Sequence, residues 1–296
     1  MTHRLFSAMA VAGTLLLAQL AVAQVAVPSL NEPGSPTQWT APAVGRVPSP
    51  HGGYATDSEE IAAERPRATR RLAPVGSRHF QMETSVDYQT ENDTAAKREQ
   101  ISFPTLLRYG LSEHVEVQMQ GNMYTFQNIS GGSNVNGFGD LFFGSKWAAL
   151  DGGGLLPSLG FAGRLGLPTG SNSVSGNALQ PQAETIMSWD MPWEMTLDGN
   201  LGMDLPPKDA AGDRFVRLTY GAAVERPLPF WSDRLNAFVE FAGAVPLKSQ
   251  KSGTHLFGTG VGFRIRDNMQ LDTFGRFGLS KSSPDVQTGL GFSWRL

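Results

Sequence analysis

The sequence predicts an all-β protein, a transmembrane antiparallel up-and-down β-barrel of about twelve strands, and three observations support this fold class. Apolar and polar residues alternate with a period of two through about twelve segments between His79 and the carboxyl terminus. Short turns and long polar loops alternate between these segments, and the chain opens with an export signal. These features together are typical of outer-membrane barrels, which have an even number of strands, short periplasmic turns and longer external loops.

The last eleven residues show the alternation most clearly. From Val286 to Leu296 one side of the extended chain is apolar or Thr, and it ends in Phe292, Trp294 and Leu296. The other side carries only Gln, Gly, Ser and Arg. Since successive side chains of a strand point to opposite faces, this segment suits a sheet with lipid on one side and water on the other. The same alternation predicts further strands at 80–89, 101–109, 115–123, 140–149, 159–167, 184–190, 193–203, 216–225, 236–245, 257–265 and 269–277.

The connections and the tryptophans indicate which end of the barrel faces the periplasm. Residues 110–113, 151–154, 191–193 and 266–268 form short turns, whereas the intervening loops are longer and rich in Gly, Asn, Ser and Asp. Five of the tryptophans are expected at the end with the short turns: Trp147, Trp189, Trp193, Trp231 and Trp294. Indole rings prefer the boundary between membrane and water. We therefore expect the turns in the periplasm.

The first residues predict export. His3 and Arg4 precede an apolar run, and Ala21-Val22-Ala23 supplies the small residues of a cleavage site. We interpret residues 1–23 as a signal peptide, 24–77 as a Pro-rich and largely disordered linker, and 78–296 as the barrel. An exported barrel of this kind is expected in the bacterial outer membrane.

The linker contains two features of its own. Residues 58–65 could form a short helix, capped by Asp57 or Ser58. Four basic residues follow within a short stretch: Arg65, Arg67, Arg70 and Arg71. This basic cluster either binds an anionic partner at the inner leaflet or the cell wall, or stays solvated, and charge runs in Pro-rich segments favour the solvated interpretation.

Composition narrows the function classes. The chain has no Cys, which excludes thiolate catalysis and Cys-based metal sites, and its net charge of -3 gives no indication of nucleic-acid binding. The glycines of Gly258-Thr259-Gly260-Val261-Gly262 lack a surrounding βαβ unit and are expected to make room in the lumen. We expect no cofactor and no metal.

The charged residues of the inward faces are the most informative set. Eleven acidic and seven basic side chains are expected toward the lumen, giving a net charge of -4 there and a preference for cations or neutral solutes. They either line a water-filled path or pair with one another across the interior. The residues predicted to line the pore are Arg108, Glu116, Asp140, Lys146, Arg164, Asp198, Arg217, Glu240, Arg264, Asp272 and Arg276.

Several short motifs resemble the MetA-pathway of phenol degradation family of outer-membrane proteins. The resembling stretches are 103–111 (FPTLLRYGL), 137–141 (GFGDL) with Lys146-Trp147, 167–170 (LPTG), and Leu271-Asp272 followed by Ser283-Pro284-Asp285. The resemblance covers residues from about 80 to 296. It implies a barrel and the passage of small molecules, with aromatic ones among the candidates, and it has no catalytic residues to carry over.

Three functions follow as hypotheses. The leading one is a channel for passive uptake or efflux of small organic solutes. The second is a barrel with a closed lumen that serves as a structural or partner anchor. The third is a lipid-modifying hydrolase at the rim, for which His255 with Ser249, Ser252 or Thr254 would be needed. Expected partners are outer-membrane lipids, a small-molecule solute and the barrel-assembly machinery, but no nucleic acid.

Overall fold

The computed structural model describes residues 60–92, 97–209, 212–248 and 251–296. These residues form antiparallel strands, and none of them belongs to a helix long and apolar enough to cross a membrane. The strands are β1 (Phe80–Asn92), β2 (Lys97–Gly110), β3 (Val115–Ile129), β4 (Val135–Gly137), β5 (Leu141–Leu150), β6 (Ser158–Leu167), β7 (Gln180–Met191), β8 (Met195–Asp204), β9 (Arg217–Pro227), β10 (Leu235–Pro246), β11 (Thr254–Arg266), β12 (Met269–Gly278) and β13 (Val286–Arg295).

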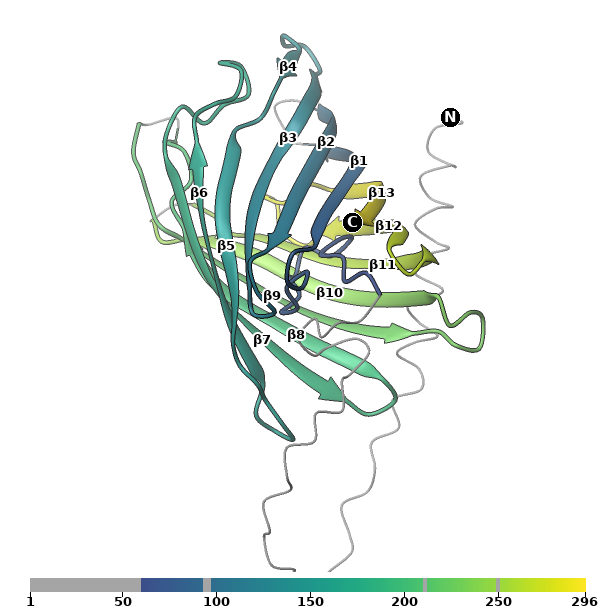
Figure 1. Ribbon diagram of the computed structural model, residues 1–296. Coiled ribbons are helices and arrows are strands. Elements are labelled where there is room, and N and C mark those ends of the chain that lie inside the picture. The colour runs from purple at the N-terminus through teal and green to yellow at the C-terminus, as the bar shows by residue number, and fades with distance from the viewer. Residues whose placement is uncertain (1–59, 93–96, 210–211, 249–250) are drawn as a thin grey trace, which may run out of the picture.

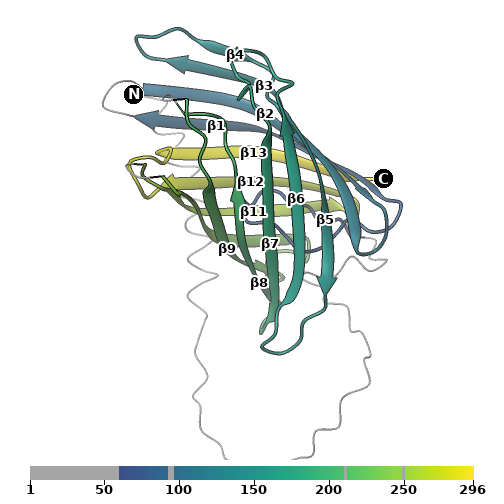
Figure 2. The same cartoon turned by 90° about the vertical axis from the view of Figure 1, so that its left-hand side faces the viewer.

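Twelve of the strands close into a single barrel (Figures 1 and 2). Each pairs with its neighbour in sequence, and β1 completes the ring by pairing with β13, from Gln81 opposite Arg295 to Thr90 opposite Val286. The three-residue β4 pairs only with the outer part of β3 and is not part of the ring. The predicted fold class is confirmed, since every one of the predicted segments overlaps a strand of the barrel. Only β4 was not expected.

The two faces of the barrel differ as the alternation predicts. Outward side chains are large and apolar, and many remain exposed, including Leu290 (70%) and Leu201 (57%). Inward side chains are mostly polar and buried, such as Gln81, Gln118 and Ser293. A barrel whose outside is apolar and whose inside is polar suits a lipid surround and a wet interior.

The connections separate into two ends. The turns β2–β3, β5–β6, β7–β8, β9–β10 and β11–β12 lie at one end together with the C-terminus, and the longer loops lie at the other. Trp147 pairs with the first residue of β3, and Trp294 pairs with the first residue of β12. Trp193 lies in the β7–β8 turn itself. These tryptophans are therefore at the turn end, as predicted.

Residues 60–78, which we call the inner segment, occupy the lumen (Figure 1, darkest blue). Both of its ends lie at the turn end of the barrel. The Ile61 N–H donates to the carbonyl of Asp267 (2.6 Å) in the β11–β12 turn, and the Arg78 N–H donates to the carbonyl of Gly110 (2.9 Å) at the end of β2. Between these points the chain reaches inward, and its middle contacts the wall of the barrel at Glu240.

This arrangement corrects the predicted linker. Residues 24–59 lie outside the described residues, but residues 60–77 are packed inside the barrel and do not form a solvated linker. Residues 58 and 59 of the predicted short helix are also outside, and residues 60–65 are not helical. The reason is that the Glu83 carboxylate accepts the backbone N–H groups of Glu64 (3.1 Å) and Arg65 (3.0 Å), which gives these donors partners without a helix.

Candidate functional site

Arg108 of β2 is the centre of the contact between the wall and the inner segment. Its guanidinium lies 2.9 Å from Glu83 and makes two contacts with Glu116, at 2.9 and 3.0 Å. It also lies 3.7 Å from Glu64 and donates to the carbonyl of Ala73 (3.0 Å) in the inner segment. Its side chain is fully buried. A planar guanidinium has five N–H donors, so one Arg can bind two wall carboxylates and the inner segment together.

Lys146 of β5 binds the same group from the other side. Its ammonium lies 2.5 Å from Glu64 and 3.4 Å from Glu116, and it donates to the carbonyls of Arg71 (3.2 Å) and Ala73 (2.9 Å). The side chain of Lys146 is fully buried, and every one of these partners is an acceptor. Buried charges are tolerated when they are paired and hydrogen-bonded in this way.

The predicted basic cluster binds the acidic side chains of the lumen. The fully buried Arg67 lies 2.7 Å from Asp198 of β8 and 3.6 Å from Glu225 of β9. Neither of the two interpretations of this cluster was correct, because the arginines are inside the barrel and not at a partner or in solvent. The other pairs of the cluster are Arg65 with Asp87, Arg70 with Glu184 and Arg71 with Glu225.

The innermost turn of the inner segment is held by Glu240 and Arg276. One oxygen of Glu240 accepts the backbone N–H groups of Ala68 (2.8 Å) and Thr69 (3.0 Å), and the other accepts from Nε of Arg276 (2.8 Å). Arg276 also donates to the carbonyl of Pro66 (2.6 Å). Two wall residues that were predicted to line a pore therefore fix backbone atoms of the segment.

One apolar cluster joins the segment to the wall, and Ile61, Ala63 and Val75 of the segment are also buried. Leu72 packs with Ala148, Ala162 and Ile186, and these four residues form one buried cluster. Gly160 of β6 makes room for this contact, since a Cβ atom there would lie 2.3 Å from Leu72. Most of the remaining contacts are ion pairs and hydrogen bonds.

The eleven residues predicted to line the pore fall into two groups. Eight of them contact the inner segment: Arg108, Glu116, Lys146, Asp198, Glu240, Arg264, Asp272 and Arg276. Three contact wall or loop residues: Asp140, Arg164 and Arg217. The structure thus gives the position of all eleven residues. Their role in lining a conducting path stays a prediction.

The predicted lumen charge needs correction. Asp190 and Glu194 are exposed at the β7–β8 turn, and Glu194 has a left-handed backbone (φ 58) that takes it out of the strand. The inner segment adds two glutamates and four of its five arginines to the interior, because Arg78 is exposed. Because its arginines pair with wall carboxylates, the net charge of -4 does not describe the folded lumen, and the cation preference loses its basis while the segment is in place.

At the loop end, Asp140 binds residues of a loop, whereas the sequence predicted that it lines the pore. Its carboxylate accepts hydrogen bonds from the backbone N–H groups of Gly170 (3.0 Å) and Gly176 (2.9 Å), and from the side-chain amide of Gln180 (2.8 Å). Gly170 and Gly176 belong to the long β6–β7 loop, and Gln180 is the first residue of β7. Asp140 therefore fixes this loop beside the mouth of the barrel.

Ion pairs of Lys248 join the β8–β9 loop to the β10–β11 loop. The ammonium of Lys248 lies 2.7 Å from Asp209 and 2.8 Å from Asp213. The hydrogen bond from Lys248 lowers the pKa of the Asp209 carboxyl below its usual range. The hydrogen bonds of Asp140 and the ion pairs of Lys248 thus hold described loop residues together at the outer end of the barrel.

His255 does not form the Ser–His pair that a rim hydrolase would need. The ring of His255 contacts the hydroxyl of Tyr220 and lies parallel to the ring of Phe241. The hydroxyl of Ser283 bonds instead to the backbone of His255, at 2.8 and 2.9 Å. Among the described residues, Ser252 and Thr254 make no hydrogen bond to the ring, and Ser249 lies outside them.

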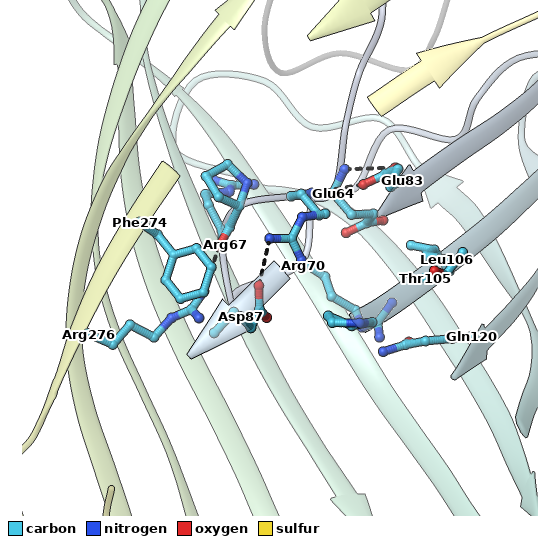
Figure 3. A pocket seen from close by; sticks show the side chains of 14 residues that line it. Glu64, Arg67, Arg70, Glu83, Asp87, Thr105, Leu106, Gln120, Phe274 and Arg276 are labelled. Carbon is cyan, nitrogen blue, oxygen red and sulfur yellow. Dashed lines mark hydrogen bonds and ion pairs between the residues drawn. The ribbon is translucent and has the colours of Figure 1, made fainter. Parts of the chain in front are cut away.

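The inner segment leaves a cavity of about 260 Å³ on its loop side (Figure 3). Phe274 and Arg276 border it on one side, and Leu106 and Gln120 border it on the other. The segment itself forms the floor with Arg65 and Arg70, among other residues.

The family model for the MetA-pathway of phenol degradation matches residues 63–296. The chain belongs to this family. The match includes most of the inner segment as well as the whole barrel. A search of the curated proteins finds no match.

Solved structures similar to this family member are outer-membrane barrels. The COG4313 outer membrane channel from Pseudomonas putida F1 has a TM-score of 0.56 and 13% sequence identity, and the match covers 80% of this chain and all of the other. The NanC porin has a TM-score of 0.51 and 9% identity, with 73% of this chain and all of the other covered. The beta domain of the Bordetella autotransporter BrkA has a TM-score of 0.50 and 13% identity, covering 73% of this chain and 98% of the other. The family member is thus a closed β-barrel of the bacterial outer membrane.

Proposed function

We propose that this protein is an outer-membrane channel through which small organic solutes move passively, and that the inner segment sets how far the channel is open. The observation that carries the proposal is the chemistry of the lumen. Its wall presents buried polar and charged side chains, and a polar segment is bound to them mainly through ion pairs. Family membership and the likeness to barrels that are named channel and porin support a channel role.

The polar contact favours a segment that can leave the lumen. When a buried ion pair separates in water, both partners are hydrated again, and this offsets much of the Coulomb attraction that is lost. An apolar seal would behave differently, because its exposure to water costs free energy in proportion to its area. Leu72 is the segment's residue in the buried apolar cluster of the described chain. The segment is therefore held firmly but not sealed by a hydrophobic core.

The solute class follows from the family and the cavity. The family name refers to phenol degradation, which supports small, including aromatic, organic solutes. A cavity of about 260 Å³ is small beside the roughly 300–1,000 Å³ of pockets for drug-sized ligands. Uptake and efflux both fit a passive path, and we expect membrane lipids and the barrel-assembly machinery as its partners.

Single-channel conductance in a planar bilayer tests the proposal. The full chain should conduct weakly, and a variant that lacks residues 61–75 should conduct several-fold more. A variant that lacks residues 30–44 is a matched control, because it removes the same length of chain but leaves the inner segment. Equal conductance of all three variants would contradict the role of the segment.

A closed barrel that serves as an anchor is the second candidate function. The completely buried network around Arg108 and Lys146 favours it, because breaking such a network is costly. This candidate predicts that the full chain does not conduct at all, whereas the channel proposal predicts a weak but measurable conductance.

A further inference from the structure

The cavity beside the inner segment has the position of a solute site. The ends of the segment lie at the turn end of the barrel, whereas Asp87, Gln120 and Phe274 on the cavity wall lie closer to the loops. A solute that enters from the loop end therefore meets this cavity before it meets the buried network around Arg108.

Arg65 is the charged group of the cavity with the loosest contacts. Its guanidinium lies 3.4 Å from Asp87 and 3.7 Å from Asp272, and its Nε is buried without a hydrogen-bond partner in the described chain. Arg108, by comparison, holds two wall carboxylates at 2.9 Å. The contact of Arg65 with Asp87 is therefore weaker than the contacts of Arg108, and it can be exchanged for a contact with another acceptor.

The surroundings of Arg65 favour an anion with an aromatic ring. The guanidinium of Arg276 lies 4.1 Å from the centre of the Phe274 ring, and that of Arg65 lies 5.8 Å from it. Leu106 faces them across the cavity (Figure 3). A carboxylate can bind a guanidinium through two parallel hydrogen bonds, and an aromatic ring attached to it gains from contact with Phe274.

The acidic groups of the cavity do not offer a comparable site for a cation. Glu83 is already bound by Arg108 and by the backbone N–H of Arg65, and Glu64 is bound by Lys146. Asp87 is partly exposed but lies next to Arg65. An incoming cation would also be repelled by Arg65 and Arg276.

We infer that the cavity is a binding site for small aromatic monocarboxylates, with Arg65 as the group that binds the carboxylate and Phe274 as the group that contacts the ring. The inference rests on the proposed function and names the solute class of that channel. The solute carboxylate replaces Asp87 at Arg65, and the buried network beneath it stays in place.

Calorimetric titration of the full-length refolded protein in detergent tests this site with three probes of similar size and with the smaller acetate. Benzoate should bind at least about tenfold more tightly than phenol, which is uncharged at pH 7, and benzylammonium should not bind measurably. Acetate should bind more weakly than benzoate because it lacks the ring. Equal affinity for benzoate and phenol would overturn the inference.

Two variants locate the site. Arg65→Gln should weaken benzoate binding about tenfold and leave phenol binding unchanged. Arg98→Gln makes the same charge change at a partly exposed ion pair near the outer rim and should leave both affinities unchanged. Phe274→Leu, which keeps an apolar side chain, should reduce the advantage of benzoate over acetate. If Arg65→Gln is folded and binds benzoate like the unchanged protein, the site is not at Arg65.

The outcomes separate this inference from the channel proposal. If removal of residues 61–75 raises conductance but benzoate does not bind the full chain, the channel stands and the carboxylate site fails. If benzoate binds through Arg65 but no variant conducts, the site stands and the channel fails.

Discussion

The carboxylate of Asp140 accepts a hydrogen bond from the backbone N–H of Gly170 at 3.0 Å, and this bond joins two motifs that are well separated in the sequence. Asp140 belongs to the stretch 137–141, and Gly170 ends the stretch 167–170. A second bond between the same stretches runs from the Leu141 N–H to the hydroxyl of Thr169 (3.0 Å). Two of the motifs that carry the family resemblance are therefore one structural unit at the mouth of the barrel.

Asp140→Ala should free the β6–β7 loop without unfolding the barrel. Hydrogen bonds to a charged acceptor contribute about 1.5–3 kcal/mol each, and the substitution removes those to Gly170, Gly176 and Gln180. Hydrogen–deuterium exchange should become faster at residues 168–180 and stay unchanged in β10–β12. Asp151→Ala, at an exposed position of the β5–β6 turn, is the control. Unchanged exchange in the loop would show that Asp140 does not hold it.

Arg108→Met should be strongly destabilising. It leaves Glu83 and Glu116 without their closest cation in a buried site, and removing one partner of a buried pair costs about 3–5 kcal/mol. Urea unfolding of the refolded protein should show this loss. Arg98→Met breaks a 3.6 Å pair with Glu91 whose partners are both partly exposed, and it should cost no more than about 1 kcal/mol. Similar losses in both variants would mean that the buried network adds little.

Ion selectivity should depend on the inner segment. The full chain should show little preference for cations, because wall carboxylates such as Asp198 and Glu225 are paired with arginines of the segment. Removing residues 61–75 takes these partners away, and the variant should become cation-selective. Reversal potentials in a salt gradient measure the change. Adding Glu116→Gln and Asp198→Asn to the shortened variant should lower the preference, and anion selectivity there would refute this account of the wall charges.

Leu290→Arg tests the assignment of the two faces. Leu290 is 70% exposed on the outside of β13, and an Arg facing lipid costs about 2–4 kcal/mol at the middle of the bilayer. Gln287→Arg adds the same side chain on the lumen side, where Gln287 bonds to Gln89, and should cost much less. The adjacent Gly289 cannot serve as the control, because a Cβ atom there would lie 2.4 Å from Asp87. The free energy of refolding into lipid vesicles measures both effects, and equal losses would mean that the assignment of the two faces is wrong.

Protease sites should report the orientation. A cleavage tag after Ser133, in the connection between β3 and β4, should be cut on intact cells. A tag after Gly153, in the β5–β6 turn, should be cut only after the outer membrane is opened. Cutting in the opposite pattern would invert the barrel in the membrane.

The barrel could be predicted from the sequence because the alternation that defines each strand is a local property of the chain. Each strand carries its own alternation, and a turn or loop marks its end, so segments such as 286–296 are recognisable without their neighbours. The short β4 was missed because three residues are too few to show a period. Its pairing depends on the neighbouring β3.

The inner segment could not be predicted because its contacts are not local. Arg67 pairs with Asp198, and the N–H of Thr69 pairs with Glu240, far along the chain. Local composition indicated only a Pro-rich, basic stretch, which is usually solvated. One signal was present, since four closely spaced arginines match the acidic excess predicted for the lumen. That match is a relation between two distant parts of the sequence, and periodicity does not detect it.

Glu60 and Ser77 both lie at the turn end of the barrel, and this has a consequence for how the protein assembles and how it responds to force. A loop whose two ends share one rim can be inserted after the ring of strands has closed, because no part of the chain has to thread through the ring. It can be withdrawn by the same route. A force applied to the chain ahead of residue 60 would break the contacts between the inner segment and the wall one after another. The first to break would be the ion pair between Glu60 and Arg264. Sequential peeling requires far less force than breaking all contacts at once, so the barrel itself would stay intact while the loop comes out.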